Sequence, residues 1–235
     1  MINGKLVLGI IPARKGSKRL KNKNILDLSG KPLIYYSIKA SINSKYIDET
    51  FVSSDSQKIL DISYSYGAKK IERPKSISND EASSFSVLEH ALRTLQDKYE
   101  YVCLLQPTSP LRSSKHIDEA CELLIKKNAD AVLSICACEH NPLWSNNLPE
   151  DLNLENFIST EVKDLPSQKL PQYYRLNGAI YLINVKQLML SRSLFLENNS
   201  FGYFMDQQSS IDIDTNIDFQ FAQFIHGSIK SNQIF

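Results

Sequence analysis

Short apolar runs alternate with longer amphipathic segments through residues 1–138, and this alternation narrows the possible folds more than any other feature of the sequence. The runs have the Val, Ile and Leu content of buried strands, and the segments between them have apolar residues at helical spacing. We predict strands at 6–13, 49–55, 68–74, 101–107 and 129–138. We predict helices at 32–44, 56–67, 84–98 and 116–128. Because crossovers between parallel strands are right-handed, this order predicts a doubly wound, mostly parallel sheet with helices on both faces, in the α/β class.

The alternation stops at residues 140–174, which are rich in Asn, Pro, Leu and Glu and have no clear period. A compact domain rarely carries so long a structureless connection, so we predict an insertion with its own role. Regular patterns return at 177–190 and 210–215, and 218–229 predicts a final amphipathic helix. We therefore expect one domain, 1–235, that carries this insertion.

A basic loop, IIPARKGSKRLKNKN, follows the first predicted strand and carries six basic residues in the eleven positions from Arg14 to Asn24. Loops at the carboxyl ends of parallel strands bind the ligands of such sheets. Fixed cations, the Ser17 hydroxyl and backbone N–H groups near Gly16 suit a polyphosphate. The spacing of a Walker loop or of a dinucleotide-binding glycine motif is absent. Charge alone fits a solvated loop or a nucleic-acid patch equally well, and the position after a strand favours phosphate.

Two acidic residues stand out in the segment SIDIDT, at 210–215. If this segment is a strand, alternation places Asp212 and Asp214 on one face and the two isoleucines on the other. Neighbouring carboxylates repel each other unless a cation lies beside them, and hard oxygen ligands suit Mg²⁺ bound together with substrate phosphates. A polar strand edge is the alternative interpretation, and the basic loop elsewhere in the chain favours the metal.

Two further loops carry hydrogen-bonding groups next to apolar strands. LQPTSPLR, at 105–112, is stiffened by two prolines and offers Gln106, Ser109 and a second hydroxyl, which suits a polyhydroxylated ligand. YRLNGAIY, at 174–181, places Arg175 and Asn177 before a buried strand, and an arginine there suits a bidentate contact with a carboxylate. Ordinary turns and a surface arginine are the alternative interpretations.

The composition excludes several classes of protein. The net charge is +1, so nothing global points to a nucleic-acid or membrane partner. No apolar run is long enough to span a membrane, and the N-terminal run leads straight into the basic loop, so we expect a buried strand and a cytoplasmic protein. Four cysteines in a chain of this length favour core thiols over a disulfide scaffold, and Cys136 and Cys138 lack the partners of a zinc site.

Taken together, these segments resemble the acylneuraminate cytidylyltransferases, the CMP-sialic acid synthetases, over nearly the whole chain. The resemblance rests on the IPAR-x-G-SK loop, VSSD at 52–55, ERPKSISNDEASS at 72–84, LQPTSPLR, EHNPL at 139–143, RLNGAIY at 175–181 and SIDIDT, in this order. It implies a Rossmann-like nucleotidyltransferase fold, a requirement for Mg²⁺, and a homodimer formed through the insertion at 140–174.

The resemblance also implies roles for individual residues. Arg14, Lys23, Asp212 and Asp214 would be catalytic, and the two aspartates would hold the metal. The triphosphate and ribose of CTP would contact Arg14, Ser17, Lys18, Lys23 and Asn24, and cytosine would contact Arg73, Ala82 and Ser84. The sugar acid would contact Gln106, Ser109, Arg175 and Asn177, with Arg175 near its carboxylate and residues of the partner subunit assisting.

The implied reaction is an in-line attack of the anomeric hydroxyl of a nine-carbon sugar acid on the α-phosphorus of CTP, with release of pyrophosphate. Three departures from the family pattern concern the ligands: SKRLKNKN lacks the usual Gly and Pro, Trp144 replaces a basic residue, and Leu176 replaces Pro. Trp144 and Leu176 lie near the expected sugar site, and they point to legionaminic acid or another relative of N-acetylneuraminic acid. The alternatives are the same chemistry on the eight-carbon acid KDO, or a non-catalytic nucleic-acid-binding protein that uses the basic loop.

Overall fold

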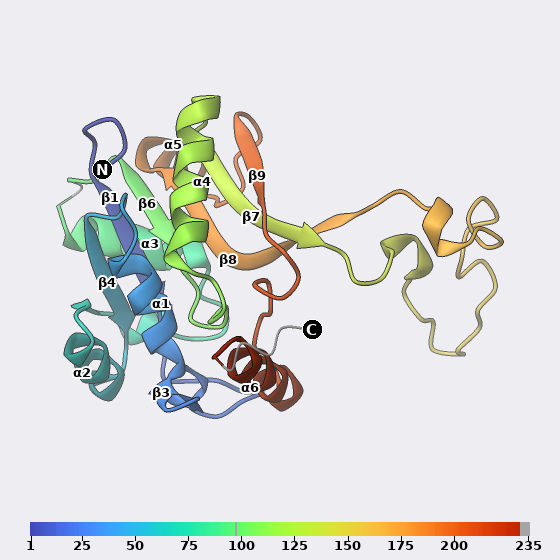
Figure 1. Cartoon of the computed structure of the whole chain (residues 1–235), viewed down its shortest axis with the longest axis horizontal. Coiled ribbons are helices and arrows are strands. Elements are labelled where there is room, and N and C mark those ends of the chain that lie inside the picture. Colours follow the sequence, from blue (N-terminus) through green and yellow to red (C-terminus); the bar gives the residue numbers. More distant parts are fainter. Residues whose placement is uncertain (97, 231–235) are drawn as a thin grey trace.

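The five strands predicted from the apolar runs all belong to one seven-stranded sheet in the computed structural model, which describes residues 1–96 and 98–230 (Figure 1). The strand order is β5-β4-β1-β6-β8-β7-β9. The strands are β1 (Val7–Pro12), β4 (Glu49–Ser54), β5 (Lys69–Glu72), β6 (Tyr101–Leu104), β7 (Ala131–Ala137), β8 (Tyr174–Asn184) and β9 (Ser200–Phe204).

Most neighbouring strands of this sheet are parallel, as predicted. β1 lies between β4 and β6 and is parallel to both, β5 is parallel to β4, and β9 is parallel to β7. β8 is the exception, because it runs antiparallel to β6 and β7. Between β7 and β8 the chain makes a long excursion instead of a helical crossover, so β8 re-enters the sheet from the end at which β7 leaves it.

Helices cover both faces of the sheet. The strand alternation of β1 shows how: Val7 and Ile11 pack on one side with α1 (Leu33–Ile42), α2 (Gln57–Ser65) and α4 (Ser114–Lys127). Leu8 and Ile10 pack on the other side with α3 (Ser84–Thr94) and α5 (Val185–Ser191). The four helices predicted before residue 129 are thereby confirmed, and the doubly wound arrangement is confirmed with them.

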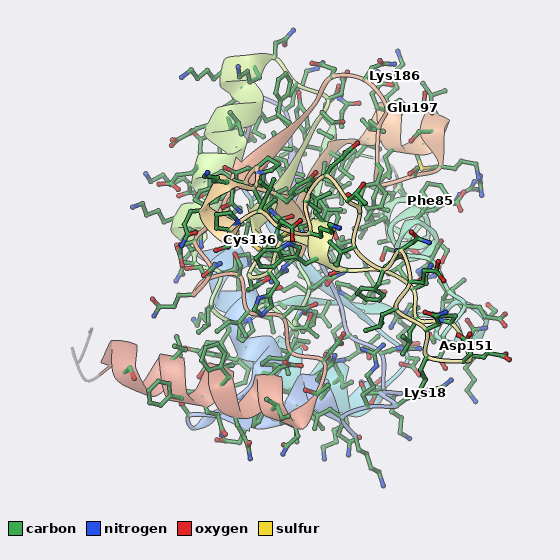
Figure 2. The ribbon with its side chains drawn as sticks, turned by 90° about the vertical axis from the view of Figure 1, so that its right-hand side faces the viewer. Lys18, Phe85, Cys136, Asp151, Lys186 and Glu197 are labelled. Carbon is green, nitrogen blue, oxygen red and sulfur yellow. The ribbon has the colours of Figure 1, made fainter. Side chains whose placement is uncertain are left out.

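A third, smaller cluster holds the last helix, α6 (Asn216–Lys230), which lies along the lower edge of the molecule in Figure 2. Its residues Phe219 and Ala222 pack with Leu28, Leu33 and Ile213. Leu28 belongs to a small hairpin formed by β2 (Asp27–Leu28) and β3 (Lys31–Pro32), which follows the basic loop. The helix therefore fixes both the end of the basic loop and the segment before itself.

The insertion between β7 and β8 is an arm that projects from the body of the molecule (Figure 1). At its root the Cys138 N–H donates to the Tyr173 carbonyl at 2.9 Å, and the Asn141 side chain donates to the Pro171 carbonyl at 2.8 Å. Beyond the root the arm has two short 3-10 helices, η3 (Pro142–Trp144) and η4 (Ser167–Lys169). Its large apolar side chains Leu148, Leu152 and Leu154 are exposed.

Two details of the sequence-based prediction were wrong. Residues 211–214 do not form a strand: the backbone of Ile213 donates to the Thr108 carbonyl without a ladder, and its side chain packs under α6. Strand β9 was not predicted, because its residues are only partly buried and lack a clear alternation.

The cysteines are free thiols, and Cys103, Cys121 and Cys136 are buried, as expected for core residues. In the part of the chain that the structure describes, no helix has the length and apolar character needed to cross a membrane.

Candidate active site

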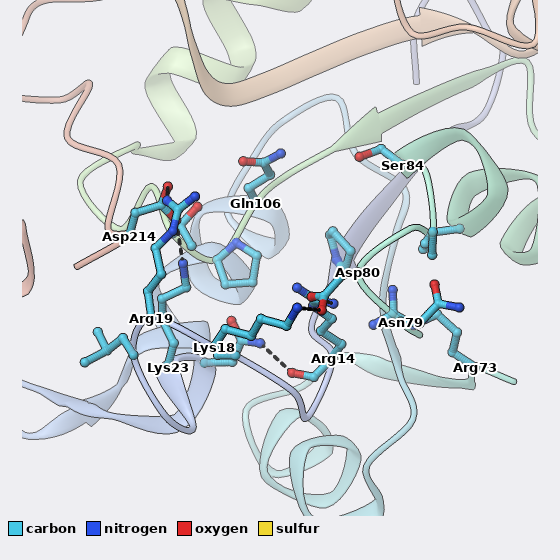
Figure 3. Close-up of a pocket in the computed structure, with 18 of the residues that line it drawn as sticks. Arg14, Lys18, Arg19, Lys23, Arg73, Asn79, Asp80, Ser84, Gln106 and Asp214 are labelled. Atoms are coloured by element: carbon cyan, nitrogen blue, oxygen red, sulfur yellow. Dashed lines mark hydrogen bonds and ion pairs between the residues drawn. The ribbon is translucent and has the colours of Figure 1, made fainter. Parts of the chain in front are cut away.

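A pocket of about 520 Å³ opens at the carboxyl ends of β1 and β6 (Figure 3). This is where ligands bind in open parallel sheets, because the loops that follow the strands gather there. Four segments far apart in the sequence meet in it: the basic loop, the residues 73–87, the loop after β6 at 106–108, and the segment 212–214. The predicted site residues that line it are Arg14, Ser17, Lys18, Lys23, Asn24, Arg73, Ala82, Ser84, Gln106, Asp212 and Asp214.

The basic loop leaves β1 at Pro12 and closes on itself before the β2–β3 hairpin. The side chain of Asn24, which is buried, donates to the carbonyl of Arg14 at 3.0 Å and joins the two ends of the loop. Asn22 has a φ of 56°, a left-handed conformation that asparagine tolerates better than most residues, and it begins the short helix η1 (Lys23–Ile25). The loop therefore holds its side chains over the pocket without glycine at this turn.

On one side of the pocket, Asp80 pairs with two cations of the loop. Arg14 Nη1 lies 2.7 Å from Asp80 Oδ1, and Lys18 Nζ lies 2.6 Å from Asp80 Oδ2. Asp80 belongs to the loop between η2 (Lys75–Ile77) and α3, so these contacts span the pocket (Figure 3). The hydrogen bonds from Lys18 and Arg14 lower the pKa of Asp80.

On the other side, Asp214 makes the same kind of contact with two more cations. Arg19 Nη1 lies 2.8 Å from Asp214 Oδ2, and Lys23 Nζ lies 2.9 Å from Asp214 Oδ1. Lys23 also donates to the Ile213 carbonyl at 2.6 Å, and its side chain is largely buried. The basic loop is thus held between two carboxylates, Asp80 and Asp214, that are far apart in the sequence.

Asp212 lies deeper than Asp214, so the two aspartates share the pocket without sharing an environment. Burial, reinforced by the charge of Asp214, raises the pKa of Asp212, although a hydrogen bond involving Thr108 opposes the shift. Asp212 Oδ1 is buried and has no hydrogen-bond partner among the described residues. The backbone beside it is fixed by a 2.8 Å hydrogen bond from Ile213 N–H to the Thr108 carbonyl.

Gln106 and Gly178 complete this deep end of the pocket. Gly178 has a φ of 76°, and a Cβ atom there would lie 2.9 Å from Gln106 Oε1 and 4.0 Å from Asp212 Oδ2. The buried Arg112 donates to the carbonyls of Gln106 and Ala179 at 3.2 and 3.0 Å, so it ties the Gln106 loop to β8. Burial lowers the pKa of Arg112 to about 10.

A second buried arginine marks the opposite end of the pocket. Arg73 follows β5, and its backbone N–H donates to the Ser54 carbonyl at 2.9 Å. Its Nε and Nη2 are buried without a partner among the described residues, and burial lowers its pKa. Ala82 and Ser84 lie nearby at the start of α3, which Ser83 caps by accepting from Ser86 N–H at 3.1 Å. Unused donors on a planar guanidinium suit a heteroaromatic ligand with carbonyl or ring-nitrogen acceptors.

Three of the predicted residues lie outside the pocket lining. Ser109 is fully buried. Asn177 is buried in a network in which its side chain accepts from Ser134 Oγ at 2.5 Å and donates to Ser210 Oγ at 2.9 Å. Arg175 lies at the root of the arm and forms a bidentate pair with Glu139, at 2.5 and 3.1 Å. Trp144 and Leu176, the departures near the expected sugar site, are also outside this lining.

Sequence reasoning missed Asp80, Arg19 and Thr108, which all line the pocket. Asp80 stands two positions before Ala82 in a segment that was already singled out, and it carries the charge opposite to that of the basic loop. That charge complementarity was the available signal. The backbone carbonyl of Thr108 accepts a hydrogen bond from the Ile213 N–H. Every residue has such a carbonyl, so the residue type could not have indicated this contact.

The deep carboxylate fits a divalent cation. A buried carboxylate oxygen without a hydrogen bond, next to a second carboxylate, is costly unless a cation lies beside it. Oxygen ligands from two aspartates are the set that Mg²⁺ takes together with substrate phosphates. Asp212 and Asp214 would hold the ion, and Asp214 would exchange its present lysine and arginine partners for it.

Comparison with known proteins places the pocket in context. A family model described as cytidylyltransferase matches residues 8–225. An N-acylneuraminate cytidylyltransferase of Escherichia coli O18:K1:H7 is 38% identical over 92% of this chain, which spans 51% of that relative's length. The chain therefore spans about half the length of this relative and of similar streptococcal ones.

Two relatives match over nearly their full length. The pseudaminic acid cytidylyltransferase of Campylobacter jejuni serotype O:2 is 34% identical over 93% of this chain and 95% of its own. The CMP-N,N'-diacetyllegionaminic acid synthase of Legionella pneumophila is 35% identical over 92% of this chain and 94% of its own length. A solved CMP:2-keto-3-deoxy-manno-octonic acid synthetase, complexed with CTP, superposes with a TM-score of 0.73 at 16% identity over 95% of this chain and 99% of that one. That likeness concerns the fold.

Proposed function

This chain belongs to the cytidylyltransferase family, and from that membership we propose that it transfers CMP from CTP to the anomeric hydroxyl of a nine-carbon 2-keto sugar acid, releasing pyrophosphate. The observation that carries the proposal is the pocket at the carboxyl ends of β1 and β6, in which four cations of the basic loop and the carboxylates of Asp212 and Asp214 line one cavity. The proposed use of CTP also implies a cytoplasmic location.

CTP would lie along the pocket between its two ends. Arg14, Lys18 and Lys23 would neutralise the triphosphate, with Ser17 and Asn24 as hydrogen-bonding neighbours. Cytosine would lie at the end formed by Arg73, Ala82 and Ser84, where buried donors have no partner within the described residues. The sugar acid would approach the deep end, where Gln106 offers an amide beside Gly178.

Catalysis in this arrangement is positioning and charge neutralisation. The anomeric hydroxyl loses its proton to water, its oxygen bonds to the α-phosphorus, and the bond from that phosphorus to the bridging oxygen of the pyrophosphate breaks. The cations of the basic loop hold the negative charge that gathers on the leaving pyrophosphate. No side chain forms a covalent bond with the nucleotide. Mg²⁺, bound by Asp212 and Asp214, would supply further charge neutralisation at the phosphates.

The sugar-acid carboxylate would meet Arg175 only if a second subunit brings the two together, because Arg175 lies at the root of the arm and outside the pocket lining. We therefore propose a homodimer in which the arm, 140–174, forms the contact. The exposed leucines of the arm support this proposal, because contiguous exposed apolar groups mark interaction sites.

A pyrophosphate-release assay tests the proposed function. Each nucleoside triphosphate is combined with a panel of acids: N-acetylneuraminic, N,N'-diacetyllegionaminic, pseudaminic and KDO. We expect release with CTP and a nine-carbon acid in the presence of Mg²⁺. Preference for KDO would move the substrate to the eight-carbon class. No release with CTP and any of the acids would refute the proposal. A nucleic-acid ligand is disfavoured by the net charge of +1 and by the cytidylyltransferase family model that matches residues 8–225.

A further inference from the structure

Asp80 occupies the cations that the proposed function gives to the triphosphate. Its two carboxylate oxygens are divided between Arg14 and Lys18, at 2.7 and 2.6 Å. The three residues come from loops on opposite sides of the pocket, and Figure 3 shows the cationic side chains reaching across to the carboxylate. A carboxylate and a phosphate offer such cations the same kind of oxygen acceptor. Asp80 therefore lies where a phosphate group would bind.

The contact is open to solvent and so is easily exchanged. The exposed fraction of the side chain is 44% for Asp80 and 81% for Lys18. Ion pairs of this kind contribute little net stability, because water screens them and the long side chains lose freedom when they pair. A triphosphate carries several negative charges against the single charge of Asp80, so it would displace the carboxylate from both cations.

We propose that Asp80 is a competing carboxylate that pairs with Arg14 and Lys18 before nucleotide binds and is exchanged for phosphate oxygens when CTP binds. This inference rests on the proposed function for the identity of the ligand. After the exchange, Asp80 would face a polyanion and would turn away from it. Because Asp80 is two residues from Ala82, that movement links the phosphate end of the pocket to the loop proposed to contact cytosine.

Asp80 could either compete with the ligand for the two cations or align the cations for the ligand. These two roles predict opposite effects on polyphosphate binding when the charge of Asp80 is removed. If the carboxylate mainly competes, Asp80→Asn tightens polyphosphate binding. If it mainly aligns the two cations, the same change weakens binding. The proposed exchange requires the first result, since a partly exposed pair costs the ligand something to break and gives it little in return.

The test is titration calorimetry of the full chain with inorganic tripolyphosphate and, separately, with CTP. We expect Asp80→Asn to lower the Kd for tripolyphosphate by about two- to thirty-fold. Asp80→Glu, which keeps the carboxylate, should bind nearly as the unaltered chain does. The matched control is Glu81→Gln, which changes the net charge equally at an exposed neighbour that forms no ion pair within the described residues, and it should shift the Kd by less than about twofold.

Tripolyphosphate separates this inference from the proposed function. Equal or weaker binding by Asp80→Asn, or no measurable binding by either protein, overturns the exchange even if the chain turns over CTP. Tighter binding by Asp80→Asn supports the exchange even if no sugar acid is converted. The KM for CTP adds a readout that a purely structural role would not move in this direction: Asp80→Asn should lower it, with an unchanged melting temperature.

Discussion

Asp212 and Asp214 differ at the level of single atoms, and that difference yields a prediction. Asp212 Oδ1 is buried without a partner in the described chain, whereas both oxygens of Asp214 already contact cations. Asp212→Asn removes a buried charge and keeps the shape, so we expect the melting temperature to stay the same or to rise. Pyrophosphate release should fall at least about a hundredfold, because the metal loses its deep ligand.

The control for this prediction is Glu122→Gln, which removes an exposed carboxylate of α4, outside the arm and the pocket lining, and should leave turnover unchanged. The measurement is a titration of initial rate against Mg²⁺ for the three proteins, together with thermal unfolding. If Asp212→Asn keeps the Mg²⁺ response of the unaltered chain, Asp212 is not a metal ligand.

Gly178 gives a second prediction at the residue scale. Its φ of 76° and the 2.9 Å approach of Gln106 Oε1 mean that Gly178→Ala meets both backbone strain and a clash. Gly4 has a φ of 78° but open space around its Cα, so Gly4→Ala meets the strain alone. Gly4→Ala should cost about 1 kcal/mol of stability, and Gly178→Ala should cost more because the clash adds to the strain. Only Gly178→Ala should raise the KM for the sugar acid, because Gln106 must move. Equal steady-state kinetics for the two variants would rule out the proposed role of Gln106.

At the scale of elements, Glu49 joins the edge of the sheet to the chain before β6. Its carboxylate lies 2.7 Å from Lys69 Nζ in β5 and 2.9 Å from Lys98 Nζ, and it also accepts a hydrogen bond from the Tyr99 hydroxyl. The hydrogen bonds from Lys69 and then Lys98 lower the pKa of Glu49 below 4.5. The stabilisation is therefore present above the unfolded-state value and is lost as the pH falls through the lower folded-state value.

Glu49→Gln should thus reduce the free energy of unfolding by about 1 kcal/mol at neutral pH, and the difference should shrink as the pH falls from the unfolded-state pKa through the lower folded-state pKa. Urea denaturation across this range measures it. Glu155→Gln, at an exposed arm carboxylate without an ion pair in the described part of the chain, should show no difference at any pH. A constant Glu49→Gln deficit down to acid pH would mean that lost packing, and not charge, is responsible.

The helices and core strands were predictable because their signal is local. β1 and α4 bury residues at the spacing that the sequence displays. The direction of β8 was not predictable in this way, since it depends on where the chain re-enters after the arm. The segment around Ile213 alternates like a strand, yet its apolar residue packs under α6 and finds no neighbouring strand. An alternating apolar pattern indicates that one side of a segment is buried, and a loop that packs over a core shows the same pattern as a strand.

At the scale of the whole molecule, some parts of the pocket could be predicted from the sequence and others could not. The basic loop, the residues 73–84 and the pair Asp212 and Asp214 were each recognised separately, and the sheet brings them to one edge as expected for loops that follow parallel strands. The pairing of particular charges, such as Asp80 with Arg14, depends on side-chain placement across the pocket. The position of Arg175 in β8, at the root of the arm, makes the sugar end depend on a second copy of the chain under the proposed function.

That dependence makes oligomeric state the decisive property of the whole molecule. If the arm forms the contact, sedimentation should give about twice 26.7 kDa at micromolar concentration, and Leu152→Lys with Leu154→Lys should give the monomer, because charges at exposed apolar contacts must be desolvated. The matched control is Leu190→Lys in α5, which has an exposed fraction of 70% against 68% for Leu152 and lies away from the arm. It should remain a dimer.

Monomeric arm variants should lose turnover while they still bind CTP, since the nucleotide end of the pocket is complete within one chain. A monomer in the unaltered protein that nevertheless turns over sugar acid would show that Arg175 has no part in the reaction.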